Sequence, residues 1–129
     1  MKTPTLEELN PFSSIILDSC ITVHKTMGPG LLESVYQHCL SKELRYRNLK
    51  VESMVQVPLT YRGEDLHKTY IIDLLVQDEI ILEIKAMDGI LPIHEAQVLS
   101  YLKLANKRLG LLINFNVKLL KEGVRRFVN

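Results

Sequence analysis

The sequence predicts a mixed α/β fold of the α+β kind, in which helices flank a four-stranded mixed sheet in the order ααβββαβ. Two observations lead to this order: apolar residues recur at helical spacing near both ends of the chain, and Ile, Leu and Val concentrate in short runs between them. The 129 residues, of which 47% are hydrophobic, suit a single compact domain spanning 1–129.

Two helices are predicted before residue 50. Asn10 and Pro11 would begin the first helix as N-cap and first helical residue, which leaves 1–10 as a loose N-terminal segment. Gly28-Pro29-Gly30 would end this helix, and the second would run from about Leu31 to Asn48. A basic cluster at the end of the second helix is the strongest local basic patch before the C-terminal segment: Lys42, Arg45, Arg47 and Lys50.

The remaining elements alternate between strands and one helix. The predicted ranges are a strand at Val51–Tyr61, strands at Tyr70–Val76 and Ile80–Ala86, a helix at Ile93–Lys107 and a strand at Arg108–Phe115. The strand, helix, strand succession at the end implies a crossover to a parallel strand. The segment from Val117 to Asn129 is short and basic, and its end could be strand-like, although it is not counted among the four strands.

The central pair of strands carries three charged residues within an apolar run. Side chains alternate along a strand, so Glu83 and Lys85 share a face. A two-residue loop between the strands would turn Asp73 away from that face. A three-residue loop, Gln77-Asp78-Glu79, pairs Asp73 with Glu83, and we expect this register.

This trio has two interpretations. Neighbouring carboxylates repel each other, a divalent cation relieves the repulsion, and a lysine beside them can stabilise developing negative charge or position a water molecule. Such a set suits metal-assisted phosphodiester hydrolysis. The alternative is a structural ion pair between a carboxylate and Lys85 at the edge of a sheet.

Other polar residues leave similar alternatives open. Glu33 borders apolar positions of the second helix, but an acidic residue in a first helical turn also suits the helix dipole. His94 is predicted to be a capping or surface residue, and it shares one side of its helix with Gln97 and Tyr101. His24, near the end of the first helix, is predicted to lie at the surface.

Composition limits the classes of function. The net charge of +1 provides no strong overall attraction for nucleic acid, so such a role needs a local basic patch. Cys20 and Cys39, without a signal peptide, favour buried reduced thiols in a cytoplasmic protein. No apolar run approaches the length of a membrane span.

Several motifs resemble one known family. Gly30-Leu31-Leu32-Glu33-Ser34-Val35-Tyr36 matches the signature Gly-x-x-Glu-x-x-Tyr, and Asp73 followed by Glu83-Ile84-Lys85 matches Asp…Glu-x-Lys. His94-Glu95-Ala96-Gln97 with Tyr101, and Leu111-Leu112-Ile113-Asn114-Phe115, resemble the rest of the GxxExxY family, which is grouped in the PD-(D/E)XK nuclease superfamily. The resemblance extends from about residue 11 to 129. The proline that often precedes the first aspartate is replaced by Ile72.

The resemblance implies a restriction-endonuclease-like core and a set of site residues. Mg²⁺ or Mn²⁺ would be bound by Asp73, Glu83 and the Ile84 carbonyl oxygen, with Glu33 as an extra acidic residue beside the metal. Lys85 would orient or activate the attacking water, and Gln97 and Tyr101 would line the site.

The resemblance implies a metal-dependent nuclease that acts on nucleic acid, DNA more readily than RNA, and that forms a homodimer. The alternative is a non-catalytic module that binds nucleic acid, a nucleotide or a protein through the same cleft. A purely structural or interaction protein is a third possibility.

Overall fold

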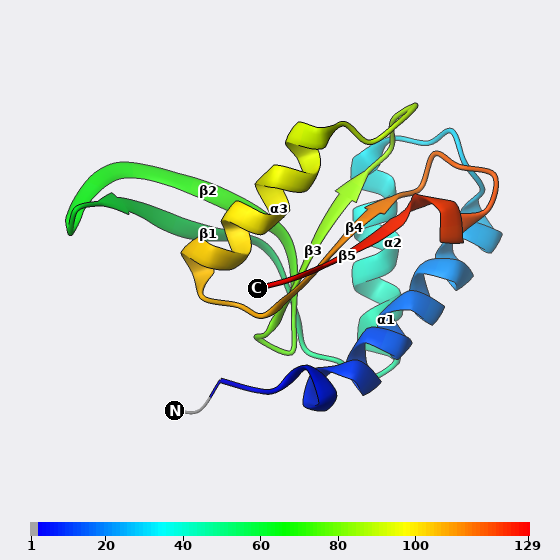
Figure 1. Ribbon diagram of the computed structural model, residues 1–129. Helices are drawn as coiled ribbons and strands as arrows, with labels where there is room; N and C mark the ends of the chain where they lie inside the picture. The colour runs from blue at the N-terminus through cyan, green and yellow to red at the C-terminus, as the bar shows by residue number, and fades with distance from the viewer. Residues whose placement is uncertain (1–2) are drawn as a thin grey trace.

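The structure, a computed structural model, describes residues 3–129, in which three helices surround a five-stranded sheet (Figure 1). The elements are α1 (Leu6–Met27), α2 (Glu33–Tyr46), β1 (Val51–Tyr61), β2 (Glu64–Val76), β3 (Ile80–Lys85), α3 (Pro92–Ala105), β4 (Leu109–Asn114), the 3₁₀ helix η1 (Leu120–Gly123) and β5 (Val124–Val128). The strand order is β1-β2-β3-β4-β5, with β3 and β4 parallel and the other neighbours antiparallel.

The mixed sheet and the parallel crossover confirm the prediction, but the strand count was wrong. A fifth strand, Val124–Val128, pairs with β4 through contacts such as Leu109 with Val128. Its two central arginines, Arg125 and Arg126, are exposed, so the apolar alternation of this segment is weak and predicts strand-like character without a defined fifth strand. This edge strand depends on pairing with β4, which is buried along its whole length.

Helix α1 begins at Leu6, before the predicted start. Thr5 is the N-cap, and its hydroxyl oxygen accepts a hydrogen bond from the Glu8 N–H at 3.2 Å. Pro11 therefore lies inside the helix, where it leaves one carbonyl without its usual partner. Burial of Leu9, which is 2% exposed, holds this additional helical segment against the core, so residues 6–10 are not a loose segment.

Two hydrophobic layers enclose the sheet. One layer joins α1 and α2 to one sheet face and includes Ile16, Leu40 and Ile84. The other joins α3 to the opposite face and includes Ile81 and Val98. The sheet is therefore covered on both sides around β3 and β4, which explains why both faces of these strands carry apolar residues, with Glu83 and Lys85 as the charged exceptions.

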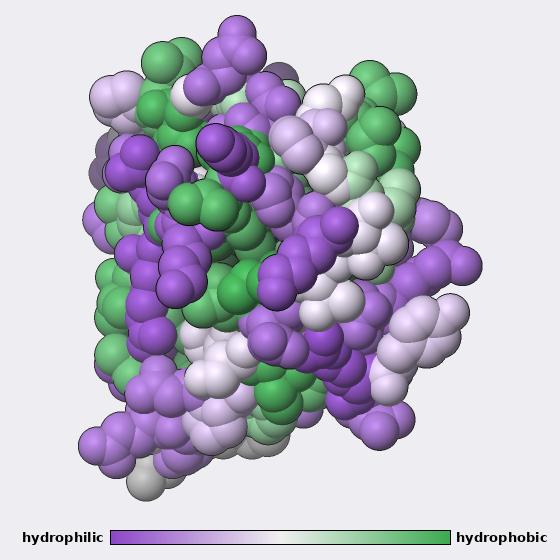
Figure 2. All heavy atoms as spheres, turned by 90° about the vertical axis from the view of Figure 1, so that its right-hand side faces the viewer, coloured by the Kyte–Doolittle hydropathy of each residue, from purple (hydrophilic) through white to green (hydrophobic). Residues whose placement is uncertain are grey.

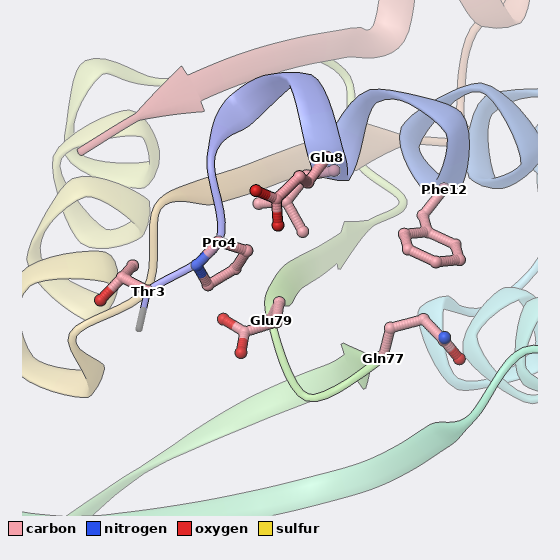
Figure 3. Close-up of a pocket in the computed structure, with 7 residues that line it drawn as sticks. Thr3, Pro4, Glu8, Phe12, Gln77 and Glu79 are labelled. Carbon is pink, nitrogen blue, oxygen red and sulfur yellow. The ribbon is translucent and has the colours of Figure 1, made fainter. Parts of the chain in front are cut away.

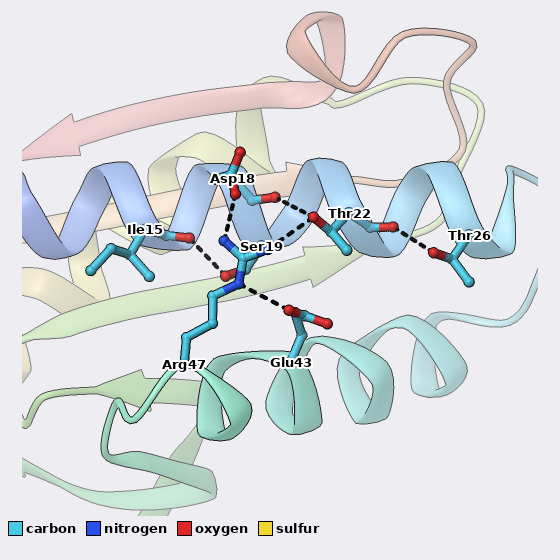
Figure 4. Close-up of polar contacts among 7 residues, drawn as sticks. All are labelled: Ile15, Asp18, Ser19, Thr22, Thr26, Glu43 and Arg47. Atoms are coloured by element: carbon cyan, nitrogen blue, oxygen red, sulfur yellow. Dashed lines mark hydrogen bonds and ion pairs between the residues drawn. The ribbon is translucent and has the colours of Figure 1, made fainter.

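The predicted basic cluster at the end of α2 is largely engaged in contacts, and Figure 4 shows those of Arg47. This arginine forms ion pairs with Asp18 of α1 and Glu43 of α2 and donates a hydrogen bond to the Thr22 hydroxyl at 2.9 Å. Lys50 is paired with Asp78 and Glu52. These residues therefore lock the ends of neighbouring elements together instead of forming a free basic patch.

His24 is buried, contrary to its predicted surface position. The loop that follows β4 covers the last turns of α1, and His24 Nε2 lies 2.8 Å from the Val117 carbonyl oxygen. Since a carbonyl can only accept, Nε2 carries the proton. The imidazole thereby fixes the start of the loop that leads to η1.

Candidate active site

The turn between β2 and β3 sets the register of the central carboxylates. Val76 pairs with Ile80, and Leu74 pairs with Leu82, so the intervening loop is the three-residue segment 77–79. The register prediction is therefore confirmed. Asp73 and Glu83 come directly after the last pair of this register, and a hydrogen bond from the Asp73 N–H to the Glu83 carboxyl group joins them.

At Asp73, β2 leaves its regular pairing with both neighbours. Pairing with β3 ends at Leu74, and pairing with β1 skips Asp73 and Met54, whose φ of 54° lies in the left-handed region. Leu74 packs in the α1–α2 layer, whereas Ile72 packs in the α3 layer, although both are even-numbered residues of one strand. The side chains of β2 therefore change faces at Asp73, although the register between β1 and β2 is the same before and after this residue.

This irregularity frees the edge of β3 for side-chain contacts. The Ile84 N–H, which has no strand partner on this side, donates a hydrogen bond to Asp73 Oδ2 at 2.8 Å. The Asp73 N–H in turn donates to Glu83 Oε1 at 3.4 Å. Because the N–H and C=O of one strand residue point to the same edge, the Ile84 carbonyl oxygen also faces this opening.

Glu83 is a buried carboxyl group with a strongly raised pKa. Only 6% of the residue is exposed. Burial, followed by the nearby Asp73 charge, raises the pKa of Glu83 from 4.5 to about 8, while Lys85 opposes the increase. The two carboxyl groups are thus close enough to disfavour simultaneous ionisation, which is the electrostatic situation that a divalent cation relieves.

Glu33 approaches this pair from the first turn of α2. Burial raises its pKa, Lys85 lowers it, and the Asp73 charge raises it again. Glu33 and Asp73 also line one cleft of about 460 Å³ between α2 and the irregular part of β1 and β2. The structure therefore brings Glu33, Asp73 and Lys85 to the same region.

The glycine and tyrosine of the Gly-x-x-Glu-x-x-Tyr segment hold Glu33 in this position. Gly30 has a φ of 96°, which favours glycine. Tyr36 is fully buried, its hydroxyl donates to the Gly28 carbonyl oxygen, and it accepts from the Leu31 N–H at 3.0 Å. The tyrosine thus fastens the loop that leads into α2.

Helix α3 contributes aromatic and polar side chains from the opposite layer. Tyr101 stacks on Tyr70 with ring centroids 4.3 Å apart, and burial followed by the Glu83 and Asp73 charges raises the pKa of Tyr101. Gln97 precedes Tyr101 by one helical turn and is exposed. His94 Nδ1 accepts the Leu91 N–H at 3.0 Å, which confirms the capping prediction.

Sequence reasoning assigned no role to Asn114, although this residue organises the loop after Lys85. It is 2% exposed, and its amide both accepts from the Met87 N–H at 3.1 Å and donates to the Met87 carbonyl at 2.9 Å. Its Oδ1 also accepts from the Asn116 N–H. An asparagine at the end of an apolar strand was the available signal, since a buried amide requires such partners.

The oxygen atoms at this point fit a hard cation. Two carboxylates and one carbonyl oxygen converge where β2 leaves β3, and Mg²⁺ is commonly bound by one or two carboxylates together with water and substrate phosphate. Within residues 3–129, no group of three or more His, Cys, Asp or Glu side chains is arranged to hold a metal ion. The protein would therefore supply part of the coordination shell, and water or substrate the rest.

Comparison with known families identifies the fold. A family model described as the PD-(D/E)XK nuclease superfamily matches residues 10–127. The chain belongs to this superfamily. Nucleases of the superfamily usually use divalent metals, and membership implies a nucleic-acid substrate. The five-stranded mixed sheet flanked by helices is consistent with a restriction-endonuclease-like fold.

The other comparisons add no relative. Neither a curated protein nor a solved structure matched the chain. Among the helices that the structure describes, none is long and apolar enough to cross a membrane.

Proposed function

We propose that this protein is a metal-dependent nuclease that hydrolyses phosphodiester bonds in nucleic acid. The observation that carries the proposal is the pairing of Asp73 with the buried Glu83 beside Lys85. A cation in this place would polarise a phosphoryl oxygen and lower the pKa of a bound water. Superfamily membership is consistent with this activity.

The side chains divide into ligands and groups that act on substrate. Asp73 and Glu83, with the Ile84 carbonyl oxygen, would hold Mg²⁺ or Mn²⁺. The Asp73 carboxylate is already oriented by the Ile84 N–H, so it would need little rearrangement to act as a ligand. Binding of a cation would release the proton that Glu83 holds because of burial and the Asp73 charge.

Lys85 would orient the attacking water and stabilise charge that develops on the phosphate. It shares a face of β3 with Glu83 and is half-buried, which limits its access to bulk water. Glu33 would add a negative charge at the cleft beside the metal, through water or directly. Gln97 and Tyr101 would line the site from α3 and contact the substrate backbone.

A second candidate function has one observation in its favour. The described residues contain no preformed group of three metal-ligating side chains, so the same cleft could serve a non-catalytic module that binds nucleic acid, a nucleotide or a protein. In that case, substitution of Asp73 would weaken ligand binding or stability without abolishing any turnover. GxxExxY membership, a homodimer and a preference for DNA over RNA also stay predictions from the resemblance.

A cleavage assay separates the two functions. Wild type, Asp73→Asn, Lys85→Ala and the control Lys68→Ala, an exposed lysine of β2, are incubated with labelled DNA and RNA in Mg²⁺, Mn²⁺ or EDTA. The nuclease proposal predicts metal-dependent cleavage by wild type and Lys68→Ala and loss of cleavage in the two site variants. Equal cleavage by wild type and both site variants would exclude this site as the source of activity. Absence of cleavage with retained oligonucleotide binding would favour the binding module.

A further inference from the structure

A further cavity lies between the last turns of α1 and the residues from Lys118 to Lys121, which enter η1. Its volume is about 430 Å³, and it is lined by Ile21, His24, Lys25, Lys118, Leu119, Leu120 and Lys121. Figure 2 views the side of the molecule that carries α1, α2 and this segment, where hydrophilic and hydrophobic side chains interleave. The cavity combines a partly apolar lining with three lysines.

The three lysines carry charges that no carboxylate of the described residues neutralises. Lys25, Lys118 and Lys121 are exposed, and none of them takes part in an ion pair within residues 3–129. Glu122 follows Lys121 but does not line the cavity. This distinguishes the site from the basic cluster at the end of α2, where Arg47 and Lys50 are neutralised by carboxylates.

The cavity has a rigid wall beside the lysines. His24 Nε2 donates to the Val117 carbonyl oxygen at 2.8 Å, which ties α1 to the residue immediately before Lys118. The His24 ring also lies 6.4 Å from the ring of Phe115, which stacks on the buried Tyr36. The lysines therefore project from positions that the core defines.

The cavity and the carboxylates lie at the same edge of the sheet. β3 and β4 are parallel, so both end at this edge, and the Phe115 N–H donates to the Lys85 carbonyl oxygen at 2.9 Å. Lys118 is three residues beyond Phe115, so their Cα atoms are at most about 11 Å apart. A strand that crosses the candidate active site could extend to the lysines within a few nucleotides.

The acidic character of the candidate active site gives these lysines a role. Asp73 and Glu33 place negative charge at the candidate active site and repel a polyanion, and the net charge of +1 provides little overall attraction. Nearby lysines would compensate, since ammonium groups bind phosphate as point charges. The cavity shown in Figure 3 is unsuited to this purpose, because Glu8 and Glu79 are the charged residues among those that line it.

We propose that Lys25, Lys118 and Lys121 form a binding site for the phosphates of a nucleic-acid strand. These phosphates belong to nucleotides other than the one whose phosphate lies at Asp73 and Glu83. The proposal rests on the proposed function in naming nucleic acid as the polyanion. Leu119, which is 60% exposed between two of the lysines, provides apolar contact for a sugar or base. The site contributes affinity and orientation of the strand and takes no part in bond cleavage.

The test is the salt dependence of binding in EDTA, where no cleavage occurs. Fluorescence anisotropy measures the affinity of a labelled single-stranded DNA oligonucleotide for wild type and for the triple variant Lys25→Ala/Lys118→Ala/Lys121→Ala over a series of NaCl concentrations. The matched control is Lys42→Ala/Lys68→Ala/Lys103→Ala, three exposed lysines on other elements. Thermal unfolding of all three proteins verifies that they are folded.

The triple variant is expected to bind more weakly, and the slope of log K against log salt should fall in magnitude by roughly 2, because each lost phosphate contact on a single strand removes about 0.7. The control should change the slope by much less. Equal slopes for wild type and the triple variant, or equal losses in both triple variants, would overturn the proposal. Absence of any wild-type binding at low salt would also overturn it.

Two further comparisons distinguish nucleic acid from an acidic protein partner, and failure of this inference from failure of the nuclease proposal. A poly-glutamate peptide that displaces the oligonucleotide as well as unlabelled DNA of equal charge would overturn the assignment of nucleic acid and indicate an acidic protein partner. Failure of the nuclease proposal would appear as no metal-dependent cleavage while binding in EDTA still depends on the lysines. Failure of this inference would appear as a salt slope that is independent of the lysines, whether or not cleavage occurs.

Discussion

The raised pKa of Glu83 predicts how the stability of the metal-free protein depends on pH. In the folded protein, burial and then the Asp73 charge raise this pKa from 4.5 to about 8. Folded Glu83 therefore holds its proton more tightly than unfolded Glu83. Its contribution to stability is complete below the unfolded pKa and is lost as the pH rises through the folded pKa.

The magnitude is large relative to the stability of a small domain. A pKa that moves from 4.5 to about 8 corresponds to about 5 kcal/mol of unfolding free energy. A typical domain has only about 5–15 kcal/mol in total. Glu33 adds an effect of the same sign, because burial, its largest cause, raises its pKa as well.

Urea unfolding followed by circular dichroism in EDTA, between about pH 5 and about pH 9, measures this effect. Wild type should lose stability with increasing pH over this range, and Glu83→Gln should lose much less, because glutamine carries no charge to bury. The control Glu64→Gln changes an exposed residue at the tip of the β1–β2 hairpin and should follow wild type. The same decline in wild type and Glu83→Gln would refute the assignment of the effect to this carboxyl group.

Two further predictions concern the structural supports of the site. Tyr36→Phe should lower the free energy of unfolding by about 1–3 kcal/mol, because it leaves the Gly28 carbonyl oxygen and the Leu31 N–H without their partner. It should also slow cleavage, because the loop that positions Glu33 is no longer fastened. Unchanged urea unfolding and unchanged cleavage would contradict this prediction. Gly123→Ala should destabilise by roughly 1–3 kcal/mol, since its Cβ would clash with the Asn114 carbonyl oxygen of the backbone. Gly89→Ala, with open space around it, should be near neutral in the same assay.

The register of the central hairpin could be predicted because it depends on local rules. Side chains alternate with a period of two, and a three-residue loop fixes which residues face each other. These rules placed Asp73 beside Glu83 without any knowledge of the rest of the fold. The helical spacing after Gly30 likewise indicated that Glu33 lies near apolar positions, and the structure brings it close to Asp73 and Lys85.

The features that sequence reasoning missed depend on contacts between distant residues. The early start of α1 follows from burial of Leu9 in a layer that other elements complete. Arg47 is neutralised by Asp18 of another helix, which a local charge count does not reveal. The strand that ends the chain forms on the buried edge of β4, and its own residues contribute little to that choice.

The change of pleat at Asp73 was also beyond sequence reasoning. Neither Met54 nor Asp73 is a residue type that marks an irregular strand position by itself, yet both fall outside the ladder between β1 and β2. The change follows from packing in two hydrophobic layers, since Ile72 is buried in the α3 layer and Leu74 in the α1–α2 layer. That irregularity is what directs the Asp73 carboxylate to the Ile84 N–H.

Calorimetric titration with Mn²⁺, on wild type and on Asp73→Asn, tests the metal site most directly. Wild type should bind the ion and release part of a proton near neutral pH, seen as a heat that varies with the buffer, because the cation displaces the proton of Glu83. Asp73→Asn should lose this binding. Equal binding by both proteins, or no binding to wild type at metal concentrations on the order of millimolar even with an oligonucleotide present, would contradict a cation site at these carboxylates.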